Sequence, residues 1–321
     1  MAIPHNSAVM SVTCSAPGSI MISGEHAVLH GYHALVGAID RRVTVNLTVR
    51  SDKLISIKSA LGNRRMRLDS IDAAPPFRFI GAVLKKYAPD MRHGVDLSIE
   101  AQFAHDVGLG SSAAVTAATL TAVKTMLTGN APEYDELLRE GLGIIRDVQG
   151  RGSGSDIAAS IYGGVVLYRR DEVIRRHTDL PHISLVYAGY KTPTPEVIRI
   201  VEEHRSQSED GFKSLFERFE NFTMAADNAL ARQDWRALGN ALSRGQLMLE
   251  MLGVCDDSLA EILAAMAAMP EITGAKISGS GLGDCVIGIG EMNKDMLPSE
   301  YRHIPVNLSD QGLTVNLSQA V

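Results

Sequence analysis

Two glycines and two serines lie close together in residues 106–114, whose sequence is Asp-Val-Gly-Leu-Gly-Ser-Ser-Ala-Ala. Gly108 and Gly110 allow backbone angles that a side chain disfavours. Residues 111–127 are rich in alanine and contain neither glycine nor proline, which predicts a buried helix that begins at the serines. The amino end of a helix offers unpaired N–H groups and the positive end of the helix dipole. The stretch therefore favours a phosphate-binding loop over an ordinary capped core helix after a turn.

Two common phosphate loops are tested against this stretch. A P-loop requires a Gly-Lys pair, and the chain contains none. The dinucleotide fingerprint is matched by Gly108, Gly110 and Ala113, but it also requires a strand after the helix. Residues 133–146 instead have the pattern of a second helix, so a dehydrogenase is only the minor alternative.

A second glycine-rich segment, residues 150–156, ends in an aspartate. Backbone N–H groups and small side chains can approach Asp156 there, which suits a general base; the alternative is a helix cap for residues 157–162. Asp147 stands nine residues earlier, and its carboxylate is a ligand type that Mg²⁺ prefers. A third glycine cluster covers residues 278–284.

The elements around these segments mix strands and helices without regular alternation, which predicts an α+β fold. A short strand at 11–15 is expected to turn at 16–18, and the alternating strand 42–50 is expected to form a hairpin with 54–57. The change from strand-rich to helix-rich sequence predicts two domains, residues 1–180 and 181–321. Further strands are expected at 95–99, 163–168, 182–187 and 313–317, and helices at 77–87, 194–203 and, in three pieces, 212–269.

Composition narrows the class of protein. The chain has 321 residues, of which 45% are apolar and 21% charged, and its net charge of −6 argues against a nucleic-acid binder. No apolar run has the length of a membrane span, and the first residues lack a signal-peptide pattern. Three widely spaced cysteines indicate neither a disulfide framework nor a metal site. We expect a cytoplasmic protein that acts on a small molecule, without membrane or nucleic-acid partners. A homodimer is its candidate oligomeric state.

Taken together, three segments resemble the motifs of the GHMP kinase superfamily, which includes galactokinase, homoserine kinase, mevalonate kinase and phosphomevalonate kinase. The resemblance extends over almost the whole chain and implies a two-domain α+β fold that binds ATP and Mg²⁺ in the cleft between its domains. The three segments are residues 16–31, 108–114 and 276–285.

Within this superfamily the chain looks most like the mevalonate kinases, on residues 24–31 and 252–259. That resemblance implies transfer of a phosphoryl group to the primary hydroxyl of mevalonate. Residues 152–159 and the ending Gly283-Asp-Cys285 are closer to the phosphomevalonate kinases, so those enzymes and other sugar or alcohol kinases remain alternatives. Mevalonate is favoured over its 5-phosphate because residues 16–32 contain no lysine or arginine to hold a second anion.

The resemblance also assigns roles to individual residues. Asp156 corresponds to the catalytic base, and Ser112 and Asp147 to the Mg²⁺ site. Glu25, His26 and Thr194 correspond to the substrate side. The ATP-binding positions are Gly108, Leu109, Gly110, Ser111, Ser112, Ala113, Gly279, Ser280 and Gly281.

One departure from the family pattern concerns the residue after Ala-Pro-Gly. The family usually has a lysine there, beside the catalytic aspartate, and this chain has Ser19. Arg151 is the candidate that supplies the missing charge, and it is therefore included among the catalytic residues. A slower enzyme, another substrate, or a regulatory protein that has lost turnover are the alternatives.

Overall fold

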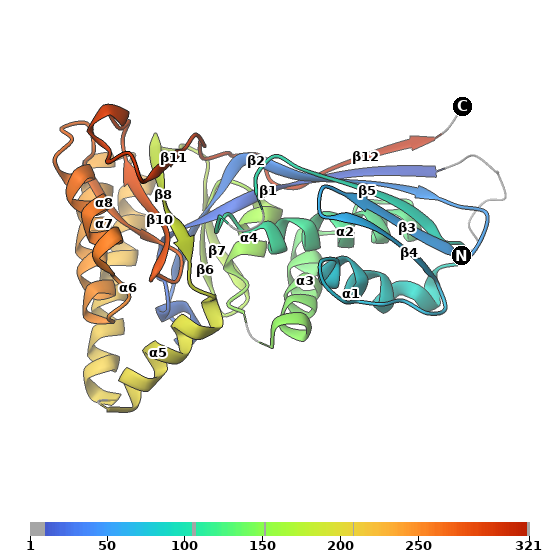
Figure 1. The fold of residues 1–321 in the computed structure, drawn as a ribbon, viewed down its shortest axis with the longest axis horizontal. Helices are drawn as coiled ribbons and strands as arrows, with labels where there is room; N and C mark the ends of the chain where they lie inside the picture. Colours follow the sequence, from blue (N-terminus) through green and yellow to red (C-terminus); the bar gives the residue numbers. More distant parts are fainter. Residues whose placement is uncertain (1–9, 105–106, 151, 208, 320–321) are drawn as a thin grey trace.

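The computed structural model describes residues 10–104, 107–150, 152–207 and 209–319. The molecule is elongated, with one sheet and its helices in each half (Figure 1). The larger sheet has the central order β12-β1-β2-β5-β3-β4, and β6 and β7 extend it beside β2. Its strands are β1 (Met10–Ser23), β2 (Ala34–Val49), β3 (Leu54–Ser59), β4 (Gly62–Arg67), β5 (Val95–Ala101), β6 (Val165–Arg169), β7 (Glu172–His177) and β12 (Thr314–Gln319).

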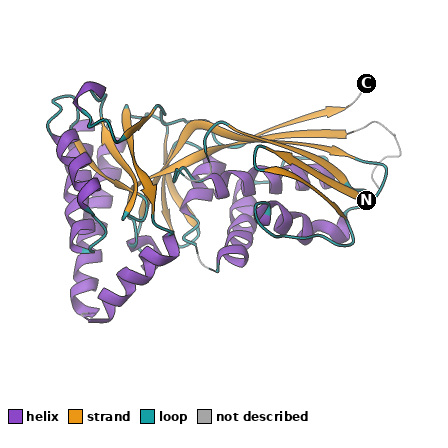
Figure 2. Cartoon of the chain, in the orientation of Figure 1, coloured by secondary structure: helices purple, strands orange, loops and turns teal. Residues whose placement is uncertain are grey.

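Four helices lie on one face of the larger sheet, as Figure 2 shows. The first two motifs and the glycine-rich segment that ends at Asp156 are therefore built between this sheet and its helices. The helices are α1 (Arg78–Tyr87), α2 (Ser111–Thr128), α3 (Tyr134–Gln149) and α4 (Ser155–Tyr162), with the short helices η1 (Ala27–His30) and η2 (Ala88–Asp90) in the connections.

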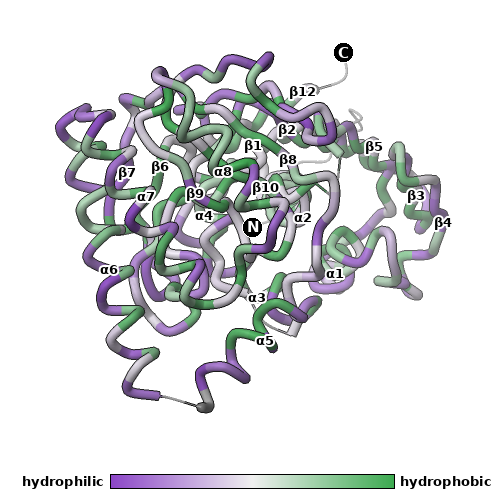
Figure 3. Tube along the Cα trace, turned by 60° about the vertical axis from the view of Figure 1, so that its left-hand side comes forward, coloured by the Kyte–Doolittle hydropathy of each residue, from purple (hydrophilic) through white to green (hydrophobic). Residues whose placement is uncertain are grey.

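The second half consists of a four-stranded sheet, ordered β11-β8-β10-β9, and the helices packed on it. Hydrophilic and hydrophobic positions alternate along α6 and α7, as expected for amphipathic helices (Figure 3). The strands are β8 (Ile183–Lys191), β9 (Gly274–Ser278), β10 (Gly283–Ile289) and β11 (Arg302–Ile304). The helices are α5 (Thr194–Gln207), α6 (Glu209–Ala231), α7 (Trp235–Met251), α8 (Asp257–Ala267) and η3 (Lys294–Met296).

The α+β class and the three successive helices of the second half are confirmed. The break after α6 is set by Asp234, whose side chain accepts a hydrogen bond from the N–H of Ala237 and so caps α7. Asp256 caps α8 in the same way, through the N–H of Leu259. Among the described residues, every helix is too short or too polar to span a lipid bilayer.

The turn expected at residues 16–18 is wrong, because β1 continues through it as a single strand. The register against β2 shifts between Pro17 and Ser19, which marks an irregularity of the kind that a β-bulge produces. Proline has no N–H to donate, so it is tolerated at such an interruption of the ladder. The first motif is thus carried on a long strand through the middle of the molecule.

The hairpin expected between 42–50 and 54–57 is also wrong. β3 lies antiparallel to β4 and parallel to β5, and β5 separates it from β2. The order is decided by long-range pairing rather than by the short turn at residues 51–53. β4, β7 and β11 are not predicted from the sequence, because their patterns are mostly polar or very short.

The two halves share a core. One buried cluster joins Ile20 and Leu35 of the larger sheet to Leu185 and Ile287 of the smaller sheet. The smaller sheet begins at Ile183, close to the expected domain boundary, but β12 returns to pair with β1. The division into residues 1–180 and 181–321 stays a prediction.

Candidate active site

The predicted phosphate loop leads directly into α2. Gly108 and Gly110 have positive φ angles of 74° and 65°, which glycine adopts without strain, and Gly110 is the residue that precedes the first turn. Val107, before Gly108, and Leu109, between the two glycines, are 5% and 2% exposed, because their side chains enter the core shared by both halves. The loop is thus anchored by its apolar residues, and its backbone N–H groups are free to meet an anion.

Ser111 and Ser112 occupy the first turn of α2 and are partly exposed. Most of the remaining helix is buried around its full circumference, as its alanine-rich sequence predicts. Ala113 is 3% exposed and packs in the main core. A rigid helix therefore fixes the direction of the loop's N–H groups.

The first motif packs directly on this loop. The N–H of Ser19 donates a hydrogen bond of 3.1 Å to the carbonyl oxygen of Leu109. A Cβ atom on Gly18 would lie 2.7 Å from that same carbonyl, and one on Gly110 would lie 1.9 Å from Ser19 Oγ. Glycine is required at both positions because two backbones approach each other closely.

Ser19 meets the predicted catalytic base. Its side chain is fully buried, and Oγ donates a hydrogen bond of 2.8 Å to Asp156 Oδ1. Asp156 lies in the first turn of α4, after Gly154 at the cap position, and no side-chain capping bond forms. The capping alternative for Asp156 is therefore wrong. Arg151 lies outside the described residues, so its catalytic role stays a prediction.

The loop that leads to Asp156 is held in place by Tyr168 of β6, which is fully buried. Its hydroxyl donates to the carbonyl oxygen of Ser153 at 2.6 Å, and a Cβ atom on Gly154 would lie 2.5 Å from that hydroxyl. Burial raises the pKa of Tyr168 above its usual value, so the phenol remains a donor. The position of Asp156 thus depends on β6 as well as on its own helix.

The third motif closes over the phosphate loop. Asp284 is 2% exposed, and its Oδ2 accepts a hydrogen bond of 2.8 Å from Lys191 Nζ. Its Oδ1 lies 1.8 Å from where a Cβ atom on Gly108 would be, and this oxygen has no hydrogen-bond partner among the described residues. Burial raises the pKa of Asp284, Lys191 lowers it, and the charge of Asp156 raises it further. From the sequence, Asp284 stands out only as part of the ending Gly283-Asp-Cys285 of the third motif.

Gly279, Ser280 and Gly281 lie in the turn between β9 and β10, as the motif predicts. Gly279 and Gly281 have φ angles of 114° and 84°. The hydroxyl of Ser280 is buried without a partner among the described residues, which leaves it available to an oxygen-rich ligand. Direct contact of these residues with ATP stays a prediction.

Glu25 and His26 connect the first motif to the third. The Glu25 carboxylate forms an ion pair with Lys276 in which both side chains are almost fully buried. His26 Nε2 donates a hydrogen bond of 2.8 Å to the carbonyl oxygen of Ser280. Burial lowers the pKa of His26, so the ring is neutral at pH 7. Both side chains brace the site, and their direct contact with a substrate stays a prediction.

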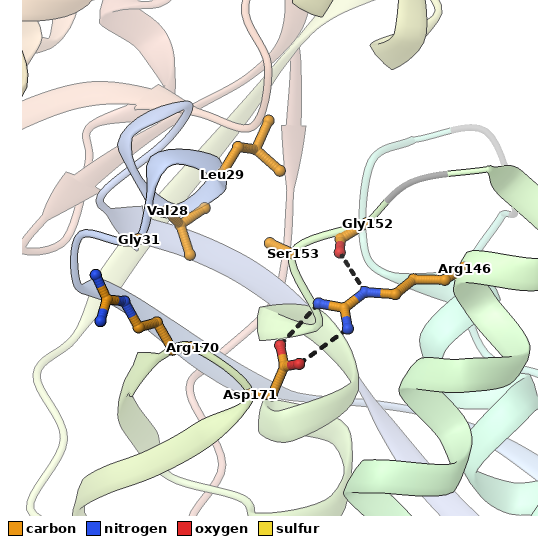
Figure 4. Close-up of a pocket in the computed structure, with 8 residues that line it drawn as sticks. All are labelled: Val28, Leu29, Gly31, Arg146, Gly152, Ser153, Arg170 and Asp171. Carbon is orange, nitrogen blue, oxygen red and sulfur yellow. Dashed lines mark hydrogen bonds and ion pairs between the residues drawn. The ribbon is translucent and has the colours of Figure 1, made fainter.

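A pocket of about 290 Å³ opens beside the Asp156 loop (Figure 4). Val28 and Leu29 form its apolar wall. Arg146 crosses another wall, where its guanidinium donates to Asp171 at 2.8 and 2.9 Å. Arg170 has no ion pair with any described residue and is exposed. The full lining is Val28, Leu29, Gly31, Arg146, Gly152, Ser153, Arg170 and Asp171.

A second pocket of about 200 Å³ adjoins the start of α2. Ser111 of the phosphate loop contributes to its wall, and most of the other residues are apolar or aromatic. Such walls suit a flat heterocyclic ring. Apart from Ser111, none of the lining residues was identified from the sequence, because they come from five separate segments. They are Val43, Ser59, Ala60, Leu61, Pro76, Phe77, Phe79, Ile80, Ile99, Ala101, Phe103, Ala104, Ser111 and Val115.

The chemistry of the proposed metal ligands fits Mg²⁺. The hydroxyl of Ser112 and the carboxylate of Asp147 have no hydrogen-bond partner among the described residues, and Asp147 is exposed near the end of α3. Within the described chain, no three His, Cys, Asp or Glu side chains cluster as a metal site. Mg²⁺ bound with a nucleotide needs only one or two protein oxygens, since phosphates and water supply the others. Thr194 is exposed at the first turn of α5, and its substrate role stays a prediction.

Comparisons with known protein families match segments that contain the three motifs. The family model described as GHMP kinases N terminal domain matches residues 77–164, and the model for GHMP kinases C terminal matches residues 228–296. A galactokinase galactose-binding signature matches residues 5–48. The first two models include the phosphate loop, Asp156 and the third motif.

Similar proteins extend along nearly the full chain. Mevalonate kinase of Archaeoglobus fulgidus is 28% identical over 277 residues, which cover 86% of this chain and 91% of that protein. Mevalonate kinase of Methanothermobacter thermautotrophicus is 29% identical, over 87% of this chain and 90% of its own. The crystal structure of the Methanococcus jannaschii mevalonate kinase has a TM-score of 0.79 and 22% identity, over 95% and 99% of the two chains. At that identity the structural match establishes the fold.

Proposed function

The chain belongs to the GHMP kinase family, and from that premise we propose that it is an ATP-dependent mevalonate kinase. The reaction transfers the γ-phosphoryl group of ATP to the primary hydroxyl of mevalonate. The observation that carries the proposal is the convergence of the three motifs around Asp156, in a chain similar along its length to curated mevalonate kinases.

The nucleotide is bound by two adjoining features. The N–H groups at the start of α2 meet the phosphates, helped by the dipole of a long helix. The apolar pocket that shares Ser111 with this loop accommodates the adenine ring. The continuity of the two features supports ATP as the phosphoryl donor.

Asp156 accepts the proton of the attacking hydroxyl. The hydroxyl oxygen bonds to the γ-phosphorus while the bond from that phosphorus to the β–γ bridging oxygen breaks, and ADP leaves. Ser19 fixes one carboxylate oxygen of Asp156 through its hydrogen bond, which leaves the other oxygen to face the acceptor. Positioning of this kind contributes much of the rate of phosphoryl transfer.

The pocket of Figure 4 receives the acceptor, since Gly152 and Ser153 lead from its wall to Asp156. Mevalonate carries one carboxylate and one methyl branch. The exposed guanidinium of Arg170 suits the carboxylate, and Val28 and Leu29 suit the methyl group. Mevalonate 5-phosphate carries a doubly charged phosphate in addition to its carboxylate, and that group requires more fixed cations than this lining offers.

When the nucleotide is bound, Ser112 and Asp147 would hold Mg²⁺, which would supply positive charge beside the phosphates. The protein oxygens named here only position it. A cytoplasmic location and a homodimer remain part of the proposal; size-exclusion chromatography with light scattering tests the dimer.

The test of function is ADP release by the purified full-length chain with a panel of acceptors under identical Mg·ATP. We expect the highest kcat/KM for mevalonate, above mevalonate 5-phosphate and galactose. Asp156→Asn is the control, because loss of a general base lowers turnover by about 10²–10⁴-fold while ATP affinity is retained. A higher kcat/KM for mevalonate 5-phosphate would show that this compound, and not mevalonate, is the substrate.

A sugar acceptor is the second candidate, since the galactose-binding signature covers the first motif. Galactose turnover that exceeds mevalonate turnover in the same panel would support it. Turnover of Asp156→Asn within threefold of the wild type would remove Asp156 from the role of base for either acceptor.

A further inference from the structure

Negative charge surrounds the phosphate loop. Asp156 approaches it from α4, and Asp284 from the third motif, and the charge of one carboxylate acts on the other. A bound ATP adds the negative charge of its phosphates. Phosphoryl transfer is therefore favoured by a side-chain cation at this place, in addition to bound Mg²⁺.

The first motif cannot supply that cation, because residues 16–32 contain neither lysine nor arginine. Lys276 of the third motif is fully buried and is already paired with Glu25. It also donates to the carbonyl oxygen of Ile277. Its ammonium group is thus committed inside the core.

Lys191 is differently placed. It ends β8, and its side chain is 29% exposed. The segment that carries it is fixed to the third motif, since both the N–H and the hydroxyl of Thr192 donate to the carbonyl oxygen of Leu282. Lys191 Nζ lies 2.8 Å from Asp284 Oδ2, and the other oxygen of that carboxylate rests against Gly108 of the phosphate loop.

We propose that Lys191 is the catalytic cation of this site, and that it moves from Asp284 to the γ-phosphoryl group when ATP binds. The proposal rests on the proposed function as an ATP-dependent kinase. It gives the chain a substitute for the positive charge that Ser19 does not provide, from a strand of the other half of the molecule.

The movement of Lys191 from Asp284 to the phosphate leaves no uncompensated charge in the site. Asp284 holds Lys191 beside the loop while the phosphate is absent. When Lys191 turns to the phosphate, Asp284 is left buried, and the same burial that raises its pKa favours uptake of a proton by this carboxylate. In the transfer step Lys191 forms and breaks no covalent bond; it stabilises the charge on the equatorial oxygens of the phosphoryl group.

The first experiment compares binding of a non-hydrolysable ATP analogue with binding of ADP by calorimetry. Lys191→Met should weaken binding of the analogue at least tenfold and change ADP affinity less than twofold, because only the analogue has a γ-phosphate. Lys191→Arg should restore most of the loss. The matched control is Lys213→Met, an exposed lysine on α6. Equal effects of Lys191→Met on both nucleotides would overturn the proposal.

A kinetic cycle separates catalysis from packing. If Lys191 only holds Asp284 in place, then Lys191→Met should cost nothing further in an Asp284→Asn background. We expect instead a loss of kcat of about 10²-fold in both backgrounds, the size found when one charge-stabilising donor is removed. The KM for the acceptor should change little.

The nucleotide comparison needs no acceptor, so it remains decisive if mevalonate is not phosphorylated. That result would reject the proposed substrate alone. If Arg151→Ala removes the preference for the analogue and Lys191→Met does not, then the cation is Arg151, and the assignment of Lys191 fails.

Discussion

At the scale of single residues, this chain has Ser19 where the family usually has a lysine, and this difference changes how the base Asp156 is held. A serine hydroxyl donates a hydrogen bond to the Asp156 carboxylate but carries no charge, whereas a lysine contributes a full charge. The fully buried Ser19 fits closely against Gly110, where there is no space for a long side chain. The site therefore divides two tasks, orientation of Asp156 and supply of charge, between separate residues.

Ser19→Ala tests the orienting role. A hydrogen bond to a charged group contributes about 1.5–3 kcal/mol, so kcat should fall by about tenfold or more while the KM for ATP stays constant. The protein should remain folded, because alanine fits the space. Steady-state kinetics with both substrates varied give the two constants. An unchanged kcat would show that Asp156 does not need the bond.

Ser112→Ala and Asp147→Asn test the metal ligands. Each removes an oxygen ligand or the group that holds its bridging water, so the Mg²⁺ concentration for half-maximal activity should rise severalfold. Asp90→Asn is the matched control on an exposed short helix. If both variants titrate like the wild type, then Mg²⁺ is held elsewhere.

At the scale of elements, α2 and its loop depend on glycine for two reasons that act together. Gly108 has a positive φ angle of 74°, and a Cβ atom there would meet the carboxylate of Asp284. Gly143 of α3 is the opposite case, since a Cβ atom there has no heavy atom within 4 Å. Replacing the glycine by alanine should therefore change the free energy of unfolding in opposite directions at the two positions.

Gly108→Ala should lower the free energy of unfolding by more than about 1 kcal/mol, the cost of a left-handed residue with a side chain, and abolish ATP binding. Gly143→Ala should raise it by about 0.5–1 kcal/mol, because alanine favours an exposed helix interior. Urea unfolding and nucleotide titration measure both effects. Destabilisation of both variants by the same amount would contradict this account.

At the scale of the whole molecule, the two halves meet through the first motif. His26 is bonded to Ser280, and His30 lies 3.1 Å from Glu202 of α5. His30 also stacks on Phe216 of α6. Both imidazoles therefore link the segment after β1 to the other half, His26 at the turn between β9 and β10 and His30 at α5 and α6.

Burial lowers the pKa of His26 and of His30 below the ordinary value of 6.5. The folded chain thus binds fewer protons than the unfolded chain as the pH falls through 6.5, and their contribution to stability is lost towards acid. We expect the free energy of unfolding to fall less between pH 7.5 and 5.5 in His30→Gln than in the wild type. Urea titrations at both pH values give the difference, and an equal fall in the two proteins would contradict it.

The sequence by itself determined the family, the α+β class, the helix that begins at Ser111 and the candidate base Asp156. These follow from local chemistry, since glycine spacing and helical periodicity act over a few residues. Tertiary structure alone decided which groups meet. Ser19 and Asp156 are 137 residues apart, and Lys191 and Asp284 are 93 apart. The place of β5 between β2 and β3, and the pocket that adjoins Ser111, were likewise fixed by long-range packing, because strand order and cavity shape depend on contacts that no short stretch of sequence encodes.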